Sequence, residues 1–221
     1  MRIFMALILV AITMPSFALA DCCGCCVDRE PTASDKPAAK VAPVSTLDDA
    51  ANADGILGID VAAMQTFDGS TAPLVVTLAP RPFAIYKGSL ADPKGAILKA
   101  VGLASSEKLF NGHNEVWSLV PLKQDAATIM PTMEYWPAVS LDPGQHASGE
   151  LSDYTTPGGK YMLAANRGAY EQLPQTWARF AAFADHNANV DTARPTMEFY
   201  YSDPGTTPPA DVVTLLYIPI N

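Results

Sequence analysis

The order of predicted secondary-structure elements repeats once along the chain, and this repeat restricts the fold more than any other sequence feature. Each copy has a β-strand, an α-helix and two further strands, judged from apolar residues that alternate in strands and recur every three to four residues in helices. Lys87-Gly88 ends the first strand of one copy, and Arg167-Gly168 ends that of the other, 80 residues later. The sequence therefore predicts an α+β fold built from duplicated strand-helix-strand-strand modules.

The expected boundaries follow from the periodicity and from turn residues. In the first copy we expect one long or bent strand that covers 74–78 and 82–86 and is interrupted at Ala79-Pro80, then a helix at 93–104 and strands at 115–122 and 133–141. In the second copy we expect a strand at 159–166, a helix at 170–184, and strands at 196–202 and 212–220. Residues 142–153 are expected to connect the two copies.

Both predicted helices have a recognisable start and an apolar face. Asp92 is a suitable N-cap, with a proline behind it at the first helical position. The inward face of this helix is expected to carry Ile97, Leu98 and Val101. The apolar stripe of the second helix consists of Tyr170, Leu173, Trp177, Phe180 and Ala184. Because Pro174 is tolerated only near a helix start, the regular part of this helix is expected to begin near Leu173.

Residues 1–20 have the composition of a secretory signal peptide. Arg2 is their only charged residue, an apolar run covers 3–12, and small residues lead up to Ala20. A membrane anchor would need a longer apolar run, so we expect cleavage after Ala20 and a periplasmic or secreted protein. No later stretch is long and apolar enough to span a bilayer, and a formal net charge of −9 argues against nucleic-acid binding.

The four cysteines, Cys22, Cys23, Cys25 and Cys26, lie directly after the expected cleavage point. Their two overlapping C-x-x-C pairs could supply thiolates to a soft metal ion such as zinc or copper(I). Local disulfides or cross-links to a protein partner are equally available in an oxidising compartment. Residues 21–72 are rich in alanine and proline and are expected to form this Cys-rich start and a flexible linker, with a candidate lead-in element at 46–67.

The strand expected at 196–202 carries the most informative polar residue of the chain. Alternation puts Met197, Phe199 and Tyr201 on one face and Glu198 with Tyr200 on the other. One face can pack in a core, while the other holds a carboxylate beside a phenol. A carboxylate removed from water can receive a cationic ligand or act as a general base, and a solvated carboxylate would do neither.

The second copy resembles the GyrI-like small-molecule-binding domain, which also forms the effector-binding module of many bacterial transcription activators. The resemblance rests on four motifs, namely Gly168-Ala169-Tyr170 at a helix start, Glu198 and Tyr200 in a strand, the Asp203-Pro204 turn, and a final strand that ends at 217–220. It covers 73–221 by element order, as a standalone exported version of the domain. The chain departs from the family at Ala169, where proline is usual, and in its divergent first copy.

This resemblance implies one antiparallel sheet with both helices on one face and a ligand groove at the module junction. Family members bind hydrophobic or cationic small molecules there, with an acidic residue at the position of Glu198. The expected aromatic walls are Tyr200, Trp117, Tyr170 and Trp177, although Trp177 on the helical stripe also fits an ordinary core. We expect no cofactor. Glu134 lies in a segment that nearly repeats the one around Glu198, and we interpret that match as a coincidence, which leaves a second pocket acid open.

Three functional hypotheses follow. The first is an exported binding protein that captures an amphipathic or cationic small molecule at Glu198. Some relatives hydrolyse reactive cyclopropane-bearing compounds, so the second is a hydrolase in which Glu198 activates water and Tyr200 assists proton transfer. The third is an envelope interaction module that holds a protein partner through its Cys-rich start.

Overall fold

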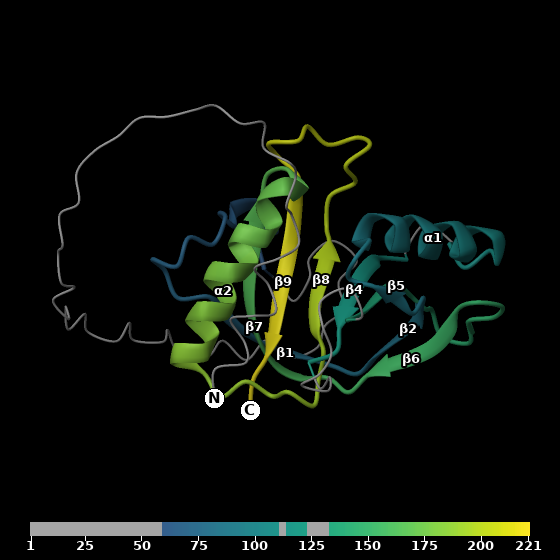
Figure 1. The fold of residues 1–221 in the computed structure, drawn as a ribbon, viewed down its shortest axis with the longest axis horizontal. Helices are drawn as coiled ribbons and strands as arrows, with labels where there is room; N and C mark the ends of the chain where they lie inside the picture. Colours follow the sequence, from purple (N-terminus) through teal and green to yellow (C-terminus); the bar gives the residue numbers. More distant parts are fainter. Residues whose placement is uncertain (1–58, 111–113, 123–132) are drawn as a thin grey trace, which may run out of the picture.

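The computed structural model describes residues 59–110, 114–122 and 133–221, which form one curled antiparallel sheet and two α-helices (Figure 1). The helices are α1 (Pro93–Ser106) and α2 (Leu173–Asn187), and two short 3-10 helices are η3 (Val61–Ala63) and η5 (Tyr170–Gln172). The strands are β1 (Leu74–Leu78), β2 (Arg81–Ile85), β3 (Gly88–Ser89), β4 (Val116–Val120), β5 (Glu134–Ser140), β6 (Ser152–Thr156), β7 (Gly159–Arg167), β8 (Thr196–Tyr200) and β9 (Val213–Pro219).

The two modules meet in the middle of the sheet, whose strand order is β1-β7-β9-β8-β4-β5-β2-β6, with β3 paired to β5 outside this path. The first module contributes β2, α1, β4 and β5, and the second contributes β7, α2, β8 and β9. At the junction β4 and β8 are antiparallel, with Ser118 directly opposite Glu198. The predicted α+β fold with two strand-helix-strand-strand modules is therefore confirmed.

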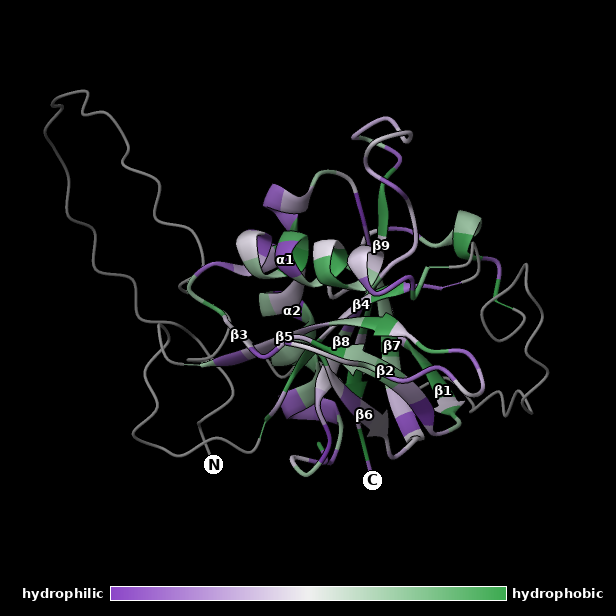
Figure 2. Cartoon of the chain, turned by 90° about the vertical axis from the view of Figure 1, so that its right-hand side faces the viewer, coloured by the Kyte–Doolittle hydropathy of each residue, from purple (hydrophilic) through white to green (hydrophobic). Residues whose placement is uncertain are grey.

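Both helices lie on the same face of the sheet, and the strand registers establish this. Val139 packs in the apolar cluster beneath α1, and Leu216 packs in the cluster beneath α2. The pairings between β5, β4, β8 and β9 place Ser118 and Glu198 on this face as well. The opposite face carries the largest core cluster, which includes Phe83, Trp117, Phe199 and Tyr217. Figure 2 shows the apolar strands lying beside the two helices.

The buried face of α1 differs from the expected one. Its buried residues are Ala96, Ala100 and Ala104, whereas Leu98 is 63% exposed. Small residues allow this helix to lie close to the sheet. A Cβ built on Gly88 would lie 2.8 Å from that of Ala96, so the spacing leaves no room for leucine at this face. The prediction of an inward Leu98 was therefore wrong.

β6 begins within residues 142–153, which the sequence predicts to be only a connection between the two copies. Ser152 and Asp153 belong to this strand, which ends the strand order of the described sheet and whose polar sequence shows no apolar alternation. β6 leads into β7 through Gly158, and β1 leads into β2 in the same way. Because β1 pairs with β7 and β2 pairs with β6, these two bent strands lie side by side. Gly158 has φ +71°, and a Cβ there would lie 2.7 Å from the Leu78 carbonyl oxygen, so this corner requires glycine.

Two arginines fix the segments that flank the sheet. Arg167 donates to the carbonyl oxygens of Ala62 and Met64, which holds the lead-in turn η3 against β7. Arg194 donates to the carbonyl oxygens of Gly158 and Ile220 at 2.8 and 2.7 Å. Within the described ranges, no helix is long and apolar enough to cross a membrane. The expected signal peptide, the four cysteines and most of the linker lie outside those ranges.

Candidate functional site

The candidate site is centred on Glu198 in β8, beneath the start of α2. The strand alternates as the sequence predicts, so Met197 and Phe199 enter the large core on one face while Glu198 lies on the helix face. Glu198 is only 9% exposed. An ionised carboxylate at such a position loses most of its hydration, so its environment must supply compensating hydrogen bonds.

Two side chains of the second module supply those bonds. The indole N–H of Trp177 donates to Glu198 Oε1 at 2.6 Å, and the Tyr200 hydroxyl donates to Oε2 at 2.6 Å. Trp177 reaches the carboxylate because it lies on the buried stripe of α2, and Tyr200 reaches it because it is two residues further along the same strand. Both carboxylate oxygens are therefore engaged by the protein itself.

A chain of hydroxyl groups extends from this carboxylate into the first module. Tyr135 in β5 donates to Ser118 Oγ at 2.7 Å, and Ser118 Oγ is 3.1 Å from the Tyr200 hydroxyl. The Tyr135 and Tyr200 oxygens are also 2.9 Å apart. Because Tyr200 donates to Glu198, donation from Tyr135 through Ser118 to Tyr200 orients three successive hydroxyls toward the carboxylate. The module junction thus joins residues from β4, β5 and β8 in one polar network.

The electrostatics of the site are set by burial. Loss of water raises the pKa of the Glu198 carboxyl above its usual value, and the hydrogen bonds from Tyr200 and Trp177 act in the opposite direction. Burial also raises the pKa of Tyr200 well above its usual value, and the neighbouring Glu198 charge adds to this effect. The phenol of Tyr200 therefore keeps its proton and acts as a hydrogen-bond donor at neutral pH.

Tyr170 forms the outer wall of the site. It lies in η5, directly before α2, and its ring meets that of Tyr200 edge to face, with centroids 5.8 Å apart. Tyr170 is 36% exposed, so one side of its ring faces solvent while the other covers Tyr200. Burial raises the pKa of this phenol too, with smaller contributions from Asp203 and Glu198.

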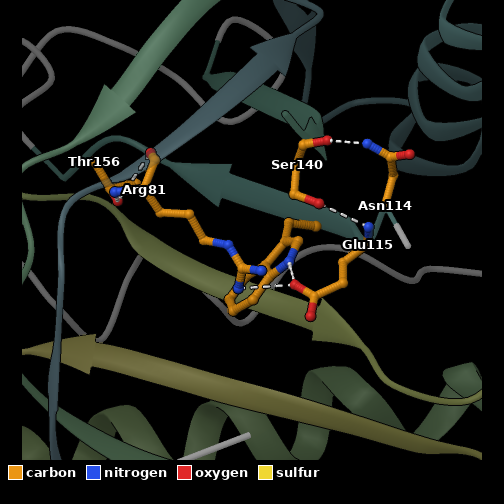
Figure 3. A network of polar contacts seen from close by, with 6 residues as sticks. Arg81, Asn114, Glu115, Ser140 and Thr156 are labelled. Atoms are coloured by element: carbon orange, nitrogen blue, oxygen red, sulfur yellow. Dashed lines mark hydrogen bonds and ion pairs between the residues drawn. The ribbon is translucent and has the colours of Figure 1, made fainter. Parts of the chain in front are cut away.

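Trp117 lies on the opposite face of the sheet from Glu198. Its ring stacks on Phe199 at 4.5 Å, and its indole N–H donates to Glu115 Oε2 at 2.9 Å. Arg81 pairs with the same carboxylate oxygen at 2.8 Å and lies over the Trp117 ring. Figure 3 shows this network around Arg81 and Glu115. Trp117 therefore does not join the other three expected aromatic residues, Tyr200, Tyr170 and Trp177, which do gather around Glu198.

Two residues of the site were not expected from the sequence, namely Ser118 and Tyr135. Tyr135 directly follows Glu134, the acid considered as a second pocket residue, but Glu134 is exposed at the start of β5 and points away from the site. The alternation of β5 turns the Tyr135 ring to the helix face. The close match between the segments around Glu134 and Glu198 aligns β5 with β8, which occupy different places in their modules.

Other hollows and clusters lie away from this group. One hollow of about 370 Å³ lies between η3 and β1, and another of about 420 Å³ lies between Asp68 and the end of α2. Neither includes Glu198. Among the residues that the structure describes, no cluster of three His, Cys, Asp or Glu side chains could hold a metal ion.

Comparison with known proteins identifies the family and the fold. The family model of the GyrI-like small molecule binding domain matches residues 73–221. The C-terminal domain of EcmrR superposes with a TM-score of 0.55 at 12% identity, over 66% of this chain and 95% of that one. The structure of SAV2435 bound to tetraphenylphosphonium superposes with a TM-score of 0.51 at 17% identity, over 68% of this chain and 94% of that one.

An uncharacterized conserved protein from Listeria innocua gives a TM-score of 0.50 at 16% identity, over 72% of this chain and 94% of that one. No curated protein matches the chain in sequence. These identities are low, so the likeness to the solved structures concerns the fold.

Proposed function

Because this chain belongs to the GyrI-like small molecule binding domain family, we propose that it binds a hydrophobic or cationic amphipathic molecule beneath the start of α2, with Glu198 as the acidic determinant. The observation that carries this proposal is the environment of the Glu198 carboxylate. Its carboxylate is buried beside aromatic rings, and no cationic side chain within the described ranges pairs with it. A ligand cation would supply the missing positive charge.

The aromatic residues around Glu198 support a hydrophobic or cationic ligand. Trp177 and Tyr200 contact the carboxylate directly, and Tyr170 covers Tyr200 from the solvent side. Aromatic faces attract cations by about 0.5–2 kcal/mol, depending on how far water is excluded. Because Glu198 is buried and Trp177 contacts it directly, an aromatic cation would gain access to the carboxylate when Trp177 rotates away. SAV2435, which shares the fold, was solved with tetraphenylphosphonium, and this cation is a suitable first probe.

Calorimetric titration with tetraphenylphosphonium tests the proposal. Glu198→Gln keeps the shape of the side chain but removes its charge, and we expect at least about tenfold weaker binding, since loss of one partner of a buried charge pair costs several kcal/mol. Glu134→Gln is the matched control because Glu134 is an exposed glutamate on the same sheet, and it should leave the affinity unchanged. Equal affinity of the parent and the Glu198→Gln variant would overturn the proposal.

Hydrolysis is the second candidate, and the hydroxyl chain favours it. In that role Glu198 would take a proton from water, Tyr200 would give its proton to the leaving group, and the hydrogen bond between them would return the proton from Glu198 to Tyr200, with Ser118 and Tyr135 holding the hydroxyls in line. However, both Glu198 oxygens already accept hydrogen bonds, so a nucleophilic water would have to displace Trp177 or Tyr200. We therefore favour binding. Turnover of a reactive electrophile that is lost in Glu198→Gln and retained in Glu134→Gln would reverse this preference.

Export forms part of the same proposal. The expected signal peptide at 1–20 would place the binding domain outside the cytoplasm, and residues 21–72 would separate it from the cleavage point. N-terminal sequencing of the protein from a cell-envelope fraction should begin at Asp21. Recovery of the intact N-terminus from the cytoplasm would contradict export without affecting the Glu198 site.

A further inference from the structure

A second polar group lies beside the Glu198 network and takes no part in it. Asn166 in β7 and Thr214 in β9 are both fully buried. Asn166 is directly opposite Thr214, and Thr214 is directly opposite Tyr200. Directly opposed residues of antiparallel strands lie about 4.5–5.5 Å apart and share one face of the sheet. The three side chains therefore form a polar row across the helix face.

This row contains two polar atoms without partners. The Thr176 hydroxyl on α2 donates to Asn166 Oδ1 at 2.7 Å, so the carbonyl end of that amide is satisfied. Asn166 Nδ2 and Thr214 Oγ1 have no hydrogen-bond partner among the described residues. More than nine in ten buried polar groups in folded proteins are hydrogen-bonded, so two neighbouring exceptions need an explanation. Leaving a buried amide or hydroxyl unpaired costs stability.

The nature of the two atoms specifies what would satisfy them. An amide NH₂ can only donate, and a threonine hydroxyl can donate as well as accept. Together they suit a hydrogen-bond acceptor such as a ketone, amide or ether oxygen. We propose that Asn166 and Thr214 form a second subsite for a carbonyl or other acceptor group on the ligand whose cation Glu198 receives.

This inference rests on the proposed function and narrows the ligand class. A purely lipophilic cation would use Glu198 and the aromatic rings but would leave Asn166 Nδ2 and Thr214 Oγ1 unpaired. A cation that carries an acceptor on its far side would pair its charge with Glu198 and its acceptor with Asn166 Nδ2 and Thr214 Oγ1. An ordered water is the rival explanation, because a buried site with two polar partners can hold one.

A matched pair of ligands separates these explanations. Tetraphenylphosphonium has no acceptor, whereas its 4-acetyl and 3-acetyl derivatives add one carbonyl to the same cation. In the parent protein we expect at least one acetyl isomer to bind about three- to tenfold more tightly than tetraphenylphosphonium, the worth of about one net hydrogen bond. This advantage should disappear in Asn166→Leu and decrease in Thr214→Val, while tetraphenylphosphonium binds both variants as it binds the parent.

Thr214→Val also gives a test without ligand. It replaces an unpaired hydroxyl by a methyl group of similar size, so the unliganded variant should be at least as stable as the parent. Thr155→Val, at an exposed position of β6, is the control and should change neither stability nor affinity. If Asn166→Leu does not fold, Thr214→Val and the ligand pair still decide the question.

The outcomes distinguish this inference from the proposed function. Tetraphenylphosphonium binding that depends on Glu198, with no gain from either acetyl isomer, overturns the second subsite alone. Destabilisation by Thr214→Val together with no acetyl gain identifies a buried water in its place. A gain that persists unchanged in both variants also overturns it. Failure of every cation to depend on Glu198 would refute the proposed function itself.

Discussion

Removal of the Tyr200 hydroxyl is the most informative single change to the network. Tyr200→Phe keeps the ring, so the edge-to-face contact with Tyr170 at 5.8 Å is retained. It deletes the 2.6 Å hydrogen bond to Glu198 Oε2 but leaves Tyr135 bonded to Ser118 at 2.7 Å. Hydrogen bonds to charged groups contribute about 1.5–3 kcal/mol, and neutral ones about 0.5–1.5 kcal/mol.

The size of this effect should depend on pH, and the structure gives its sign. The Tyr200 hydrogen bond lowers the pKa of Glu198, which burial has raised, so its removal raises that pKa further. Ionisation of Glu198 in the folded protein therefore costs more free energy in the variant than in the parent. We expect a loss of about 0.5–1.5 kcal/mol where the carboxyl is protonated, increasing to about 1.5–3 kcal/mol as pH rises through the folded pKa.

Urea denaturation at a series of pH values, followed by tryptophan fluorescence, measures this directly. Tyr201→Phe is the control, since Tyr201 is 45% exposed and lies next to Tyr200 in the sequence. It should change the free energy of unfolding by less than about 0.5 kcal/mol at any pH. The reasoning is refuted if Tyr200→Phe behaves like Tyr201→Phe, or if its effect shrinks as pH rises.

Three further predictions concern stability. Burial raises the folded-state pKa of Glu198 above its unfolded value, so the parent loses stability as pH rises from the unfolded towards the folded pKa. Glu198→Gln should escape this loss, and urea titrations should show its stability relative to the parent increasing across that window; a constant difference would contradict this. Arg194→Lys should cost about 1.5–3 kcal/mol because a lysine cannot keep both carbonyl bonds and the ion pair, whereas exposed Arg179→Lys should cost nothing measurable. Phe180→Ala should cost about 3–5 kcal/mol by thermal or urea unfolding, because this ring on the inner face of α2 is fully buried; a loss below about 1 kcal/mol would show that the surrounding core closes over the vacated space.

The sequence predicted the parts of the site that depend on local periodicity. Glu198 and Tyr200 share a face because a strand alternates strictly, and Trp177 lies inward because the apolar stripe of α2 follows helical spacing. The α+β modules were predictable for the same reason, since each element has its own periodic pattern. These features are set by residues close together in the chain.

Features that depend on pairing between distant strands were not predictable in this way. Alternation shows that Trp117 and Ser118 face opposite sides, but only the register of β4 against β8 decides which of them meets Glu198. Tyr135 joins the site through the register of β5 against β4. The buried face of α1 consists of alanines because the helix lies close to the sheet at Gly88. Periodicity alone does not reveal this distance.

The central claim is that Glu198 receives a ligand cation, and proton release on binding tests it most directly. Because burial raises the pKa of the unliganded carboxyl and an adjacent cation would lower it, part of the protein population must lose a proton when the cation binds. Tetraphenylphosphonium titrations in buffers of different ionisation enthalpy, across the acidic to neutral range, measure that release. The account predicts proton release in the parent and none in Glu198→Gln. Binding without proton release at every pH, or equal release in both proteins, would contradict it.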